Sequence, residues 1–275
     1  AFITCSFALD FTFIGLTWNT MRTDAADGGR QAQQASSDAA GGGRQAQQSS
    51  SDAILCLHGF GMSGAALERW LMPVSTALHP IETCFIDGPI MNGGGDQIWG
   101  GGRIWWHAER SGEPARWRYT GVDKALESVS AAQAARVAAT GKGFVGVLGF
   151  SQGAALASLV AALHTADAER SPVPSLRFAV LLNGFPWSDV ATGHMQLFRS
   201  DRLICSPSLH VSSVADTVVK PRSSQALARF FQEPEWHWHD AGHTIPEDAQ
   251  WLATLRAFVQ RHRDTCSRSA HSSRL

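Results

Sequence analysis

The stretch FVGVLGFSQGAALASLVAAL, residues 144–163, joins two different hydrophobic patterns at a single serine. Its first part is short, apolar and β-branched, which favours a buried strand, whereas its second part is rich in alanine and leucine and favours a helix. Ser151 lies where the period changes, between Gly149 and Gly153. The pattern therefore predicts a serine on a sharp strand-to-helix turn, where glycines let the helix start lie against the strand.

The same alternation of short apolar runs and helical stretches continues along the chain from Ala53. The expected strands lie in ILCLHGF, ETCFIDGP, FVGVLGF, FAVLLNGF, SLHVSSVAD and EWHWHDAGH, and the expected helices lie at 65–78, 121–139, 152–164, 223–231 and 247–263. Strands that alternate with helices form parallel sheets that are covered on both faces. We therefore predict an α/β fold with a mostly parallel central sheet and helices on both faces.

A polar tandem repeat precedes this region. The segment GGRQAQQASSDAA begins at Gly28 and returns as GGRQAQQSSSDAI at Gly42. Both copies are rich in Gly, Gln, Ser and Ala, a composition that cannot bury enough apolar surface to fold. We therefore expect a disordered N-terminal extension over residues 1–52, a folded domain over residues 53–263 and a disordered C-terminal tail over residues 264–275.

Charge and cysteine content exclude several classes of partner. The formal net charge is -1, so the chain offers no basic surface for nucleic acid. The five cysteines are widely scattered, without the spacing of a zinc site or a disulfide framework, which indicates a reducing compartment and a cytoplasmic location. The apolar opening AFITCSFALDFTFIGLTW carries Asp10 and lacks a basic leader, so we expect neither a signal peptide nor stable membrane insertion. The sequence does not indicate which oligomeric state the protein adopts.

Three polar residues directly follow apolar runs and together suggest nucleophilic catalysis. Because the carboxyl ends of parallel strands meet at one edge of a sheet, we expect Ser151, Asp216 and His243 to gather there. A serine needs a base to remove its proton, and the order Ser, Asp, His is that of α/β-hydrolases. We predict Ser151 as nucleophile, His243 as base and Asp216 as the acid. The backbone N–H groups of Gln152 and Phe60, the latter in LHGFG, would form an oxyanion hole.

Two other aspartates and one other histidine are alternatives for parts of this site. Asp240 precedes His243 by three residues, which is a tight geometry for orienting its ring, and Asp189 would serve as a helix N-cap. The placement therefore favours Asp216. His58 lies beside the expected oxyanion loop, but a histidine after a buried strand is more often a structural hydrogen-bonding group.

The segment HWHDAGH also admits a metal site. His237 and His239 would point to the same face of a strand, with His243 nearby, and zinc uses such clusters. Trp236 and Trp238 alternate with these histidines as in a half-buried strand, and no further ligand cluster completes the site. We therefore expect no metal and no other cofactor.

The segment 90–119 interrupts the strand and helix pattern. It holds two glycine clusters and five aromatic residues, Trp99, Trp105, Trp106, Trp117 and Tyr119. We interpret it as a lid or pocket wall, with Trp105 and Trp106 as candidate substrate contacts together with Met62. A local aromatic core is the alternative interpretation.

These motifs resemble the FSH-type serine hydrolases, a branch of the α/β-hydrolases. The resemblance covers residues 53–263 and rests on LHGFG, FIDGP, RIWW, GFSQGA, LLNGF, SLHVSSVADTVV and HDAGHTIP. GFSQGA is shared with acyl-protein thioesterases and carboxylesterases, whereas the paired tryptophans of RIWW and the GHTIP ending favour the FSH type. The resemblance implies an α/β-hydrolase fold, with Ser151 as nucleophile, Asp216 as acid and His243 as base, and without a cofactor.

The resemblance also implies a reaction, the hydrolysis of small-molecule carboxylic esters or acyl thioesters through an acyl-enzyme intermediate. Two departures from the family pattern bear on the site. Met62 stands where the family often has glutamine, and Ser212 or Ser213 stands where it often has glycine. The first would alter hydrogen bonding in the oxyanion loop, and the second would tighten the turn that carries Asp216. The alternative function is a small-molecule-binding protein that keeps the fold with slow or no turnover.

Overall fold

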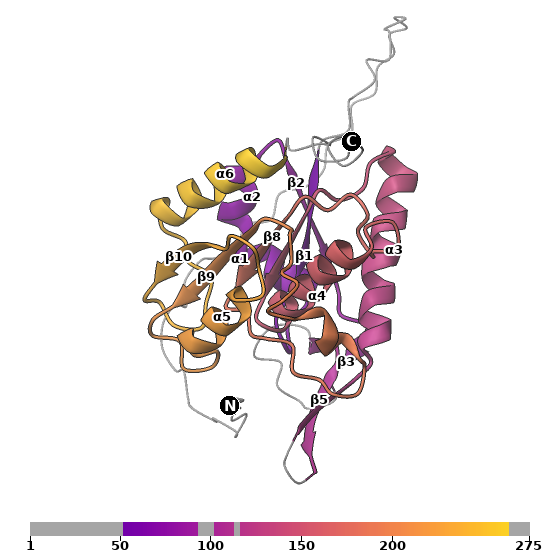
Figure 1. Ribbon diagram of the computed structural model, residues 1–275. Coiled ribbons are helices and arrows are strands. Elements are labelled where there is room, and N and C mark those ends of the chain that lie inside the picture. The colour runs from indigo at the N-terminus through magenta and orange to yellow at the C-terminus, as the bar shows by residue number, and fades with distance from the viewer. Residues whose placement is uncertain (1–51, 93–101, 113–115, 264–275) are drawn as a thin grey trace, which may run out of the picture. The chain divides into compact units, whose positions relative to one another are not determined.

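The computed structural model describes residues 52–92, 102–112 and 116–263 (Figure 1). Its centre is a six-stranded sheet in the order β10-β9-β8-β7-β1-β2, and every neighbouring pair is parallel. The strands are β1 (Ala53–Leu57), β2 (Glu82–Ile86), β7 (Gly146–Phe150), β8 (Phe178–Leu182), β9 (Ser208–Ser213) and β10 (Glu235–His239). The fold is therefore the predicted α/β class with a parallel central sheet.

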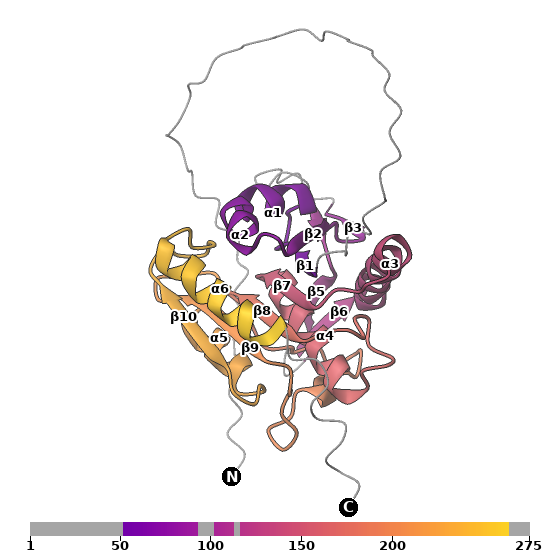
Figure 2. The ribbon, with the colours of Figure 1, turned by 90° about the horizontal axis from the view of Figure 1, so that it is seen from above.

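Helices cover both faces of this sheet (Figure 2). They are α1 (Gly64–Trp70), α2 (Met72–Leu78), α3 (Val122–Thr140), α4 (Gln152–Ala166), α5 (Pro221–Ala228) and α6 (Ala249–Arg263). On one face, alternate strand residues such as Ile54 and Leu148 form a core cluster with Leu67 of α1, Val74 of α2 and Phe258 of α6. Helix α4 packs on β7, β8 and β1, and α5 packs on β9. Both faces of the central strands are therefore buried, which explains why these strands are apolar throughout.

Two expected elements differ from those observed because of proline. The helix expected at 65–78 is two helices, α1 and α2, separated at Leu71. Pro73 lies at the start of α2, where its missing N–H costs nothing, whereas within one continuous helix its ring would clash with the preceding turn. Helix α5 begins at Pro221, before the expected start at residue 223, because proline favours the first turn of a helix, and it ends at Ala228, before the expected end at residue 231.

The segment 90–119 contains regular structure that the sequence did not reveal. Strands β3 (Ile90–Met91) and β4 (Arg103–Ile104) form one antiparallel pair, and β5 (His107–Ser111) and β6 (Arg116–Thr120) form another. A short 3-10 helix, η2 (His194–Leu197), follows β8. Trp99 lies outside the described residues, as do the C-terminal tail and residues 1–51 of the N-terminal extension. Within the described ranges, no helix combines the length and apolar character needed to cross a membrane.

Candidate active site

Ser151 stands on a sharp turn between β7 and α4. Its backbone has φ 53° and ψ -113°, a positive φ that is uncommon outside glycine, and its N–H donates to the Leu182 carbonyl at 2.9 Å. A Cβ at Gly149 would lie 2.1 Å from the Gly153 carbonyl oxygen, and a Cβ at Gly153 would lie 2.1 Å from that of Leu57. The two glycines are therefore required because the start of α4 lies against the backbones of β7 and β1.

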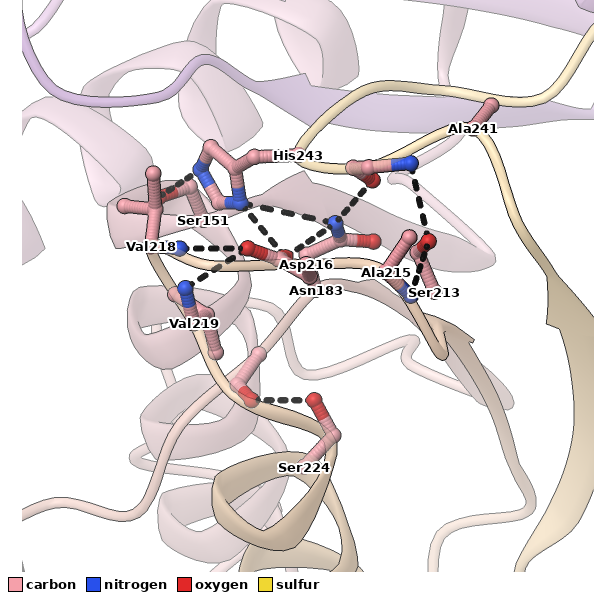
Figure 3. Close-up of polar contacts among 12 residues, drawn as sticks. Ser151, Asn183, Ser213, Ala215, Asp216, Val218, Val219, Ser224, Ala241 and His243 are labelled. Carbon is pink, nitrogen blue, oxygen red and sulfur yellow. Dashed lines mark hydrogen bonds and ion pairs between the residues drawn. The ribbon is translucent and has the colours of Figure 1, made fainter.

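The three residues predicted to work together lie within hydrogen-bond distance (Figure 3). Ser151 Oγ is 3.1 Å from His243 Nε2, and His243 Nδ1 is 2.7 Å from Asp216 Oδ2. Ser151 follows β7, Asp216 follows β9 and His243 follows β10, so all three come from the carboxyl ends of parallel strands. The Asp216 side chain is 0% exposed and that of His243 is 19% exposed, so the carboxylate is enclosed while the imidazole reaches solvent.

Backbone and side-chain donors fix the Asp216 carboxylate. Oδ1 accepts the N–H groups of Val218 and Val219, each at 2.8 Å, and Oδ2 accepts the Asn183 amide at 2.7 Å in addition to His243. A carboxylate oxygen that accepts from His243 places the imidazole proton on Nδ1. Nε2 is then left as an acceptor for the Ser151 hydroxyl, which is the tautomer that a general base needs.

The alternative acids lie elsewhere. Asp189 is buried and accepts the N–H groups of Tyr119, Ala191 and Thr192, so its carboxylate fixes a loop and the β6 strand. Asp240 lies directly after β10. Of the three candidate aspartates, Asp216 is the one that contacts His243.

His58 organises the loop that follows β1. Its Nε2 accepts the Gly88 N–H at 2.8 Å, so the ring proton is on Nδ1, which donates to the Gly59 carbonyl at 2.7 Å. Burial lowers the pKa of His58, which keeps the ring in the neutral form that this pair of hydrogen bonds requires. The ring also stacks on Trp105 with centroids 4.8 Å apart. His58 is thus a structural hydrogen-bonding group.

The Gln152 side chain links the turn at Ser151 to the segment after β4. Its Oε1 accepts the Trp105 N–H at 3.0 Å and its Nε2 donates to the Trp106 carbonyl at 2.9 Å. The Trp105 indole N–H then donates to the His58 carbonyl at 2.8 Å. These contacts join both predicted oxyanion loops into one network. Among the described residues, the backbone N–H groups of Phe60 and Gln152 have no hydrogen-bond partner.

The predicted pocket residues are enclosed in the protein. Trp105 is 0% exposed, Trp106 is 1% exposed and Met62 is 2% exposed. Trp106 packs against Tyr119 and Trp187 with ring centroids 5.4 and 5.1 Å apart, as in the alternative interpretation of a local aromatic core. In this conformation these side chains support the loops around Ser151, and their contact with substrate stays a prediction.

The histidines considered for a metal do not converge. His237 and His239 lie on β10, whereas His243 contacts Asp216 and Ser151. Burial lowers the pKa values of both His237 and His239, as expected for rings on a half-buried strand. In the part of the chain that the structure describes, no group of three or more His, Cys, Asp or Glu residues is placed to hold a metal ion.

Asn183 was not among the residues predicted from the sequence. This residue directly follows β8, is fully buried and adopts φ 51°, a left-handed conformation that asparagine tolerates better than most residues. The signal was present, because Asn183 is a polar residue at the end of the apolar run FAVLL. The same rule that selected Ser151, Asp216 and His243 selects it as well.

A parallel sheet with a serine on a strand-to-helix turn and an aspartate and a histidine at the same edge defines the α/β-hydrolase class. The chain matches the serine hydrolase family FSH1 over residues 48–255, and it belongs to this family. It is similar to esterase OVCA2 of Mus musculus, with 33% identity over 230 residues that cover 75% of this chain and 94% of the relative. It is also similar to esterase OVCA2 of Bos taurus, with 35% identity over 167 residues that cover 58% and 68%.

The fold is similar to that of a solved esterase. The crystal structure of esterase PE8 matches with a TM-score of 0.56 and 24% sequence identity, over 78% of this chain and 94% of that one. This likeness concerns the fold. The family membership and the esterase relatives identify an esterase-type hydrolase.

Proposed function

We propose that this hydrolase cleaves carboxylic esters or acyl thioesters through a Ser151, His243 and Asp216 triad. His243 Nε2 takes the Ser151 proton as Oγ attacks the acyl carbonyl, and Asp216 holds the imidazole and stabilises its charged form. His243 then gives the proton to the leaving alcohol or thiol. Water, activated in turn by His243, hydrolyses the acyl-enzyme to release the acid and restore the serine.

The backbone supplies the charge stabilisation in this mechanism. The N–H groups of Gln152 and Phe60 receive the oxyanion of the tetrahedral intermediates. That of Gln152 lies in the first turn of α4, where the helix dipole also favours negative charge. The network of His58, Trp105 and the Gln152 side chain fixes the two loops that carry these donors.

The observation that carries the proposal is the continuous hydrogen-bonded path from Ser151 to Asp216. Two distances of 3.1 and 2.7 Å link nucleophile, base and acid in the order that the reaction requires. Apolar side chains next to these groups favour a substrate with an apolar acyl portion. Phe60 is 50% exposed on the oxyanion loop, and Val218 is 45% exposed two residues after Asp216.

Acyl-enzyme trapping tests the proposal. The protein is mixed with p-nitrophenyl butyrate or with an acyl thioester, quenched in acid within the first turnover and digested for peptide mass analysis. We expect a burst of product and an acyl mass on the peptide that holds Ser151. Steady turnover with an acyl group on another residue contradicts the triad. Ligand-dependent thermal stabilisation without turnover of any ester or thioester supports the binding-protein alternative.

A further inference from the structure

Two side chains hold the backbone of Gly242, the residue before His243: Ser213 at the end of β9 and Asn183 directly after β8 (Figure 3). The Gly242 N–H donates to Ser213 Oγ at 2.9 Å, and the Gly242 carbonyl accepts a long hydrogen bond of 3.5 Å from Asn183 Nδ2. Gly242 itself has φ 80°, so the chain turns sharply as it delivers His243. The position of the base therefore depends on residues of β9 and of the turn after β8.

Ser213 joins this loop to the turn that carries the acid. It is the last residue of β9 and is fully buried, and its Oγ also accepts the Ala215 N–H at 3.2 Å. One hydroxyl thus receives a donor from the residue before Asp216 and another from the residue before His243. A change at this oxygen alters the spacing between the two loops.

Asn183 acts on the same pair from the other side. Asp216 Oδ2 accepts both Asn183 Nδ2 and His243 Nδ1, each at 2.7 Å. The two nitrogens of Asn183 and His243 are 3.4 Å apart, but Nδ1 gives its proton to Asp216 and cannot accept another. The amide hydrogens therefore go to Asp216 and Gly242. A reversed amide would place its oxygen against a carboxylate and a carbonyl, which fixes the assignment.

We propose that Asn183 and Ser213 are positioning residues. By hydrogen bonding to the carbonyl and the N–H of Gly242, respectively, they hold His243 Nδ1 on Asp216 Oδ2. The inference rests on the proposed function, because it assigns these residues an effect on the triad. Neither side chain touches the reacting atoms. Their contribution is to the orientation of the base, so it acts on the rate of the chemical step, and substrate binding is left unchanged.

The serine has a matched control in the neighbouring residue. Ser212 lies next to Ser213 on β9 and is also fully buried, but its Oγ has no hydrogen-bond partner among the described residues. Ser213→Ala leaves two N–H groups without their acceptor, and we expect kcat to fall about 10-fold at unchanged KM. Ser212→Ala removes the same atom without breaking a hydrogen bond, and its kcat should stay within about twofold of wild type.

Asn183 is tested by two variants of different character. Asn183→Gly removes the amide and adopts φ 51° without strain, so we expect kcat to fall about 10- to 100-fold at unchanged KM. Asn183→Asp keeps the shape but places a second acceptor against Asp216, so its loss should be larger. Urea unfolding of each variant, monitored by tryptophan fluorescence, gives the folded fraction under assay conditions.

The outcomes separate this inference from the proposed function. Turnover by Ser151→Ala in the same assay overturns the triad itself. An inactive Ser151→Ala variant together with wild-type kcat in Ser213→Ala and Asn183→Gly overturns only the positioning role. Equal losses in Ser212→Ala and Ser213→Ala, or losses that follow the folded fraction alone, also overturn it. If Asn183→Gly does not fold, the paired serine variants still decide the question.

Discussion

The two halves of this active site are built in different ways. The nucleophile half, named for the role proposed for Ser151, depends on close backbone packing, because Gly149 and Gly153 admit the start of α4 where any Cβ would meet backbone at 2.1 Å. The acid and base half is specified by side-chain hydrogen bonds, in which Asp216, Ser213 and Asn183 tie loops from three strands together. Close backbone packing leaves a recognisable pattern of glycines in the sequence. Hydrogen bonds between residues that are distant along the chain leave no such pattern.

The difference also predicts how each half fails. A side chain added at the nucleophile turn opposes backbone atoms, so it costs folding stability. A donor or acceptor removed from the acid and base half leaves the fold in place but loosens the ring of His243, so it costs rate. Variants of the two halves should therefore separate into losses of stability and losses of kcat.

The largest effect on rate is expected from Ser151→Ala. The substitution removes only the nucleophilic hydroxyl, so kcat for p-nitrophenyl butyrate should fall by about 100,000-fold or more. Urea unfolding should be nearly unchanged, because the hydroxyl is lost without a cavity in the core. Residual turnover near that of wild type would mean that another group attacks the ester.

Asp216→Asn should have the next largest effect. An amide can present N–H to His243 Nδ1 and so favour the tautomer with its proton on Nε2, which cannot accept from Ser151. We expect kcat to fall about 1,000- to 10,000-fold with KM little changed. Asp240→Asn is the control, since Asp240 does not contact His243, and it should keep most activity. A greater loss of kcat in Asp240→Asn than in Asp216→Asn would show that Asp216 is not the acid of the triad.

The nucleophile half is tested by a glycine pair. In Gly153→Ala the new Cβ opposes the Leu57 carbonyl, so we expect a loss of about 3 kcal/mol or more in unfolding free energy, or no folded protein. Gly141, the C-cap of α3, has φ 74° and nothing within 4 Å of an added Cβ, so Gly141→Ala should cost only the strain of about 1 kcal/mol. Equal losses of unfolding free energy in the two variants would show that the close approach of backbone atoms at Gly153 does not decide stability.

The smallest expected effect is on the pH dependence of stability, through a histidine on β9, the strand that precedes Asp216. Burial lowers the pKa of His210 on β9 from 6.5 to about 3. As pH falls below 6.5 the unfolded chain takes up the proton first, so stability present at neutral pH is lost progressively toward pH 3. At pH 5 the loss from this residue is about 2 kcal/mol. Urea unfolding of His210→Gln should show a shallower decline between pH 7 and 5, and an unchanged slope contradicts this assignment.

The sequence predicted most of the scaffold because its apolar periods are strong. Five of the six strands of the central sheet lie within the predicted runs, β1 begins one residue before its run, and the turn at Ser151 is where the period changes. The break at Leu71 was missed because the apolar spacing continues across Pro73. The hairpin of β5 and β6 was missed because its residues are largely polar, so they carry no period of buried positions.

The site was predictable where chemistry demands a residue type. Ser151, Asp216 and His243 follow strands and lie within hydrogen-bond distance, as their placement suggested. The contacts of Ser213 were not predictable, because a buried serine on a strand has many possible hydrogen-bond partners. Its actual partners, Ala215 and Gly242, lie 2 and 29 residues away along the chain. Only the fold brings these groups together.

Labelling with a fluorophosphonate probe would test directly whether Ser151 is the activated nucleophile, because such probes react with a serine only when a base activates it. The purified protein is labelled to completion, digested and analysed by peptide mass, with Ser151→Ala and Asp216→Asn treated in parallel. We predict a stoichiometric adduct on Ser151, no adduct in Ser151→Ala and much slower labelling of Asp216→Asn. An adduct on another serine, or none on folded wild-type protein, would contradict it.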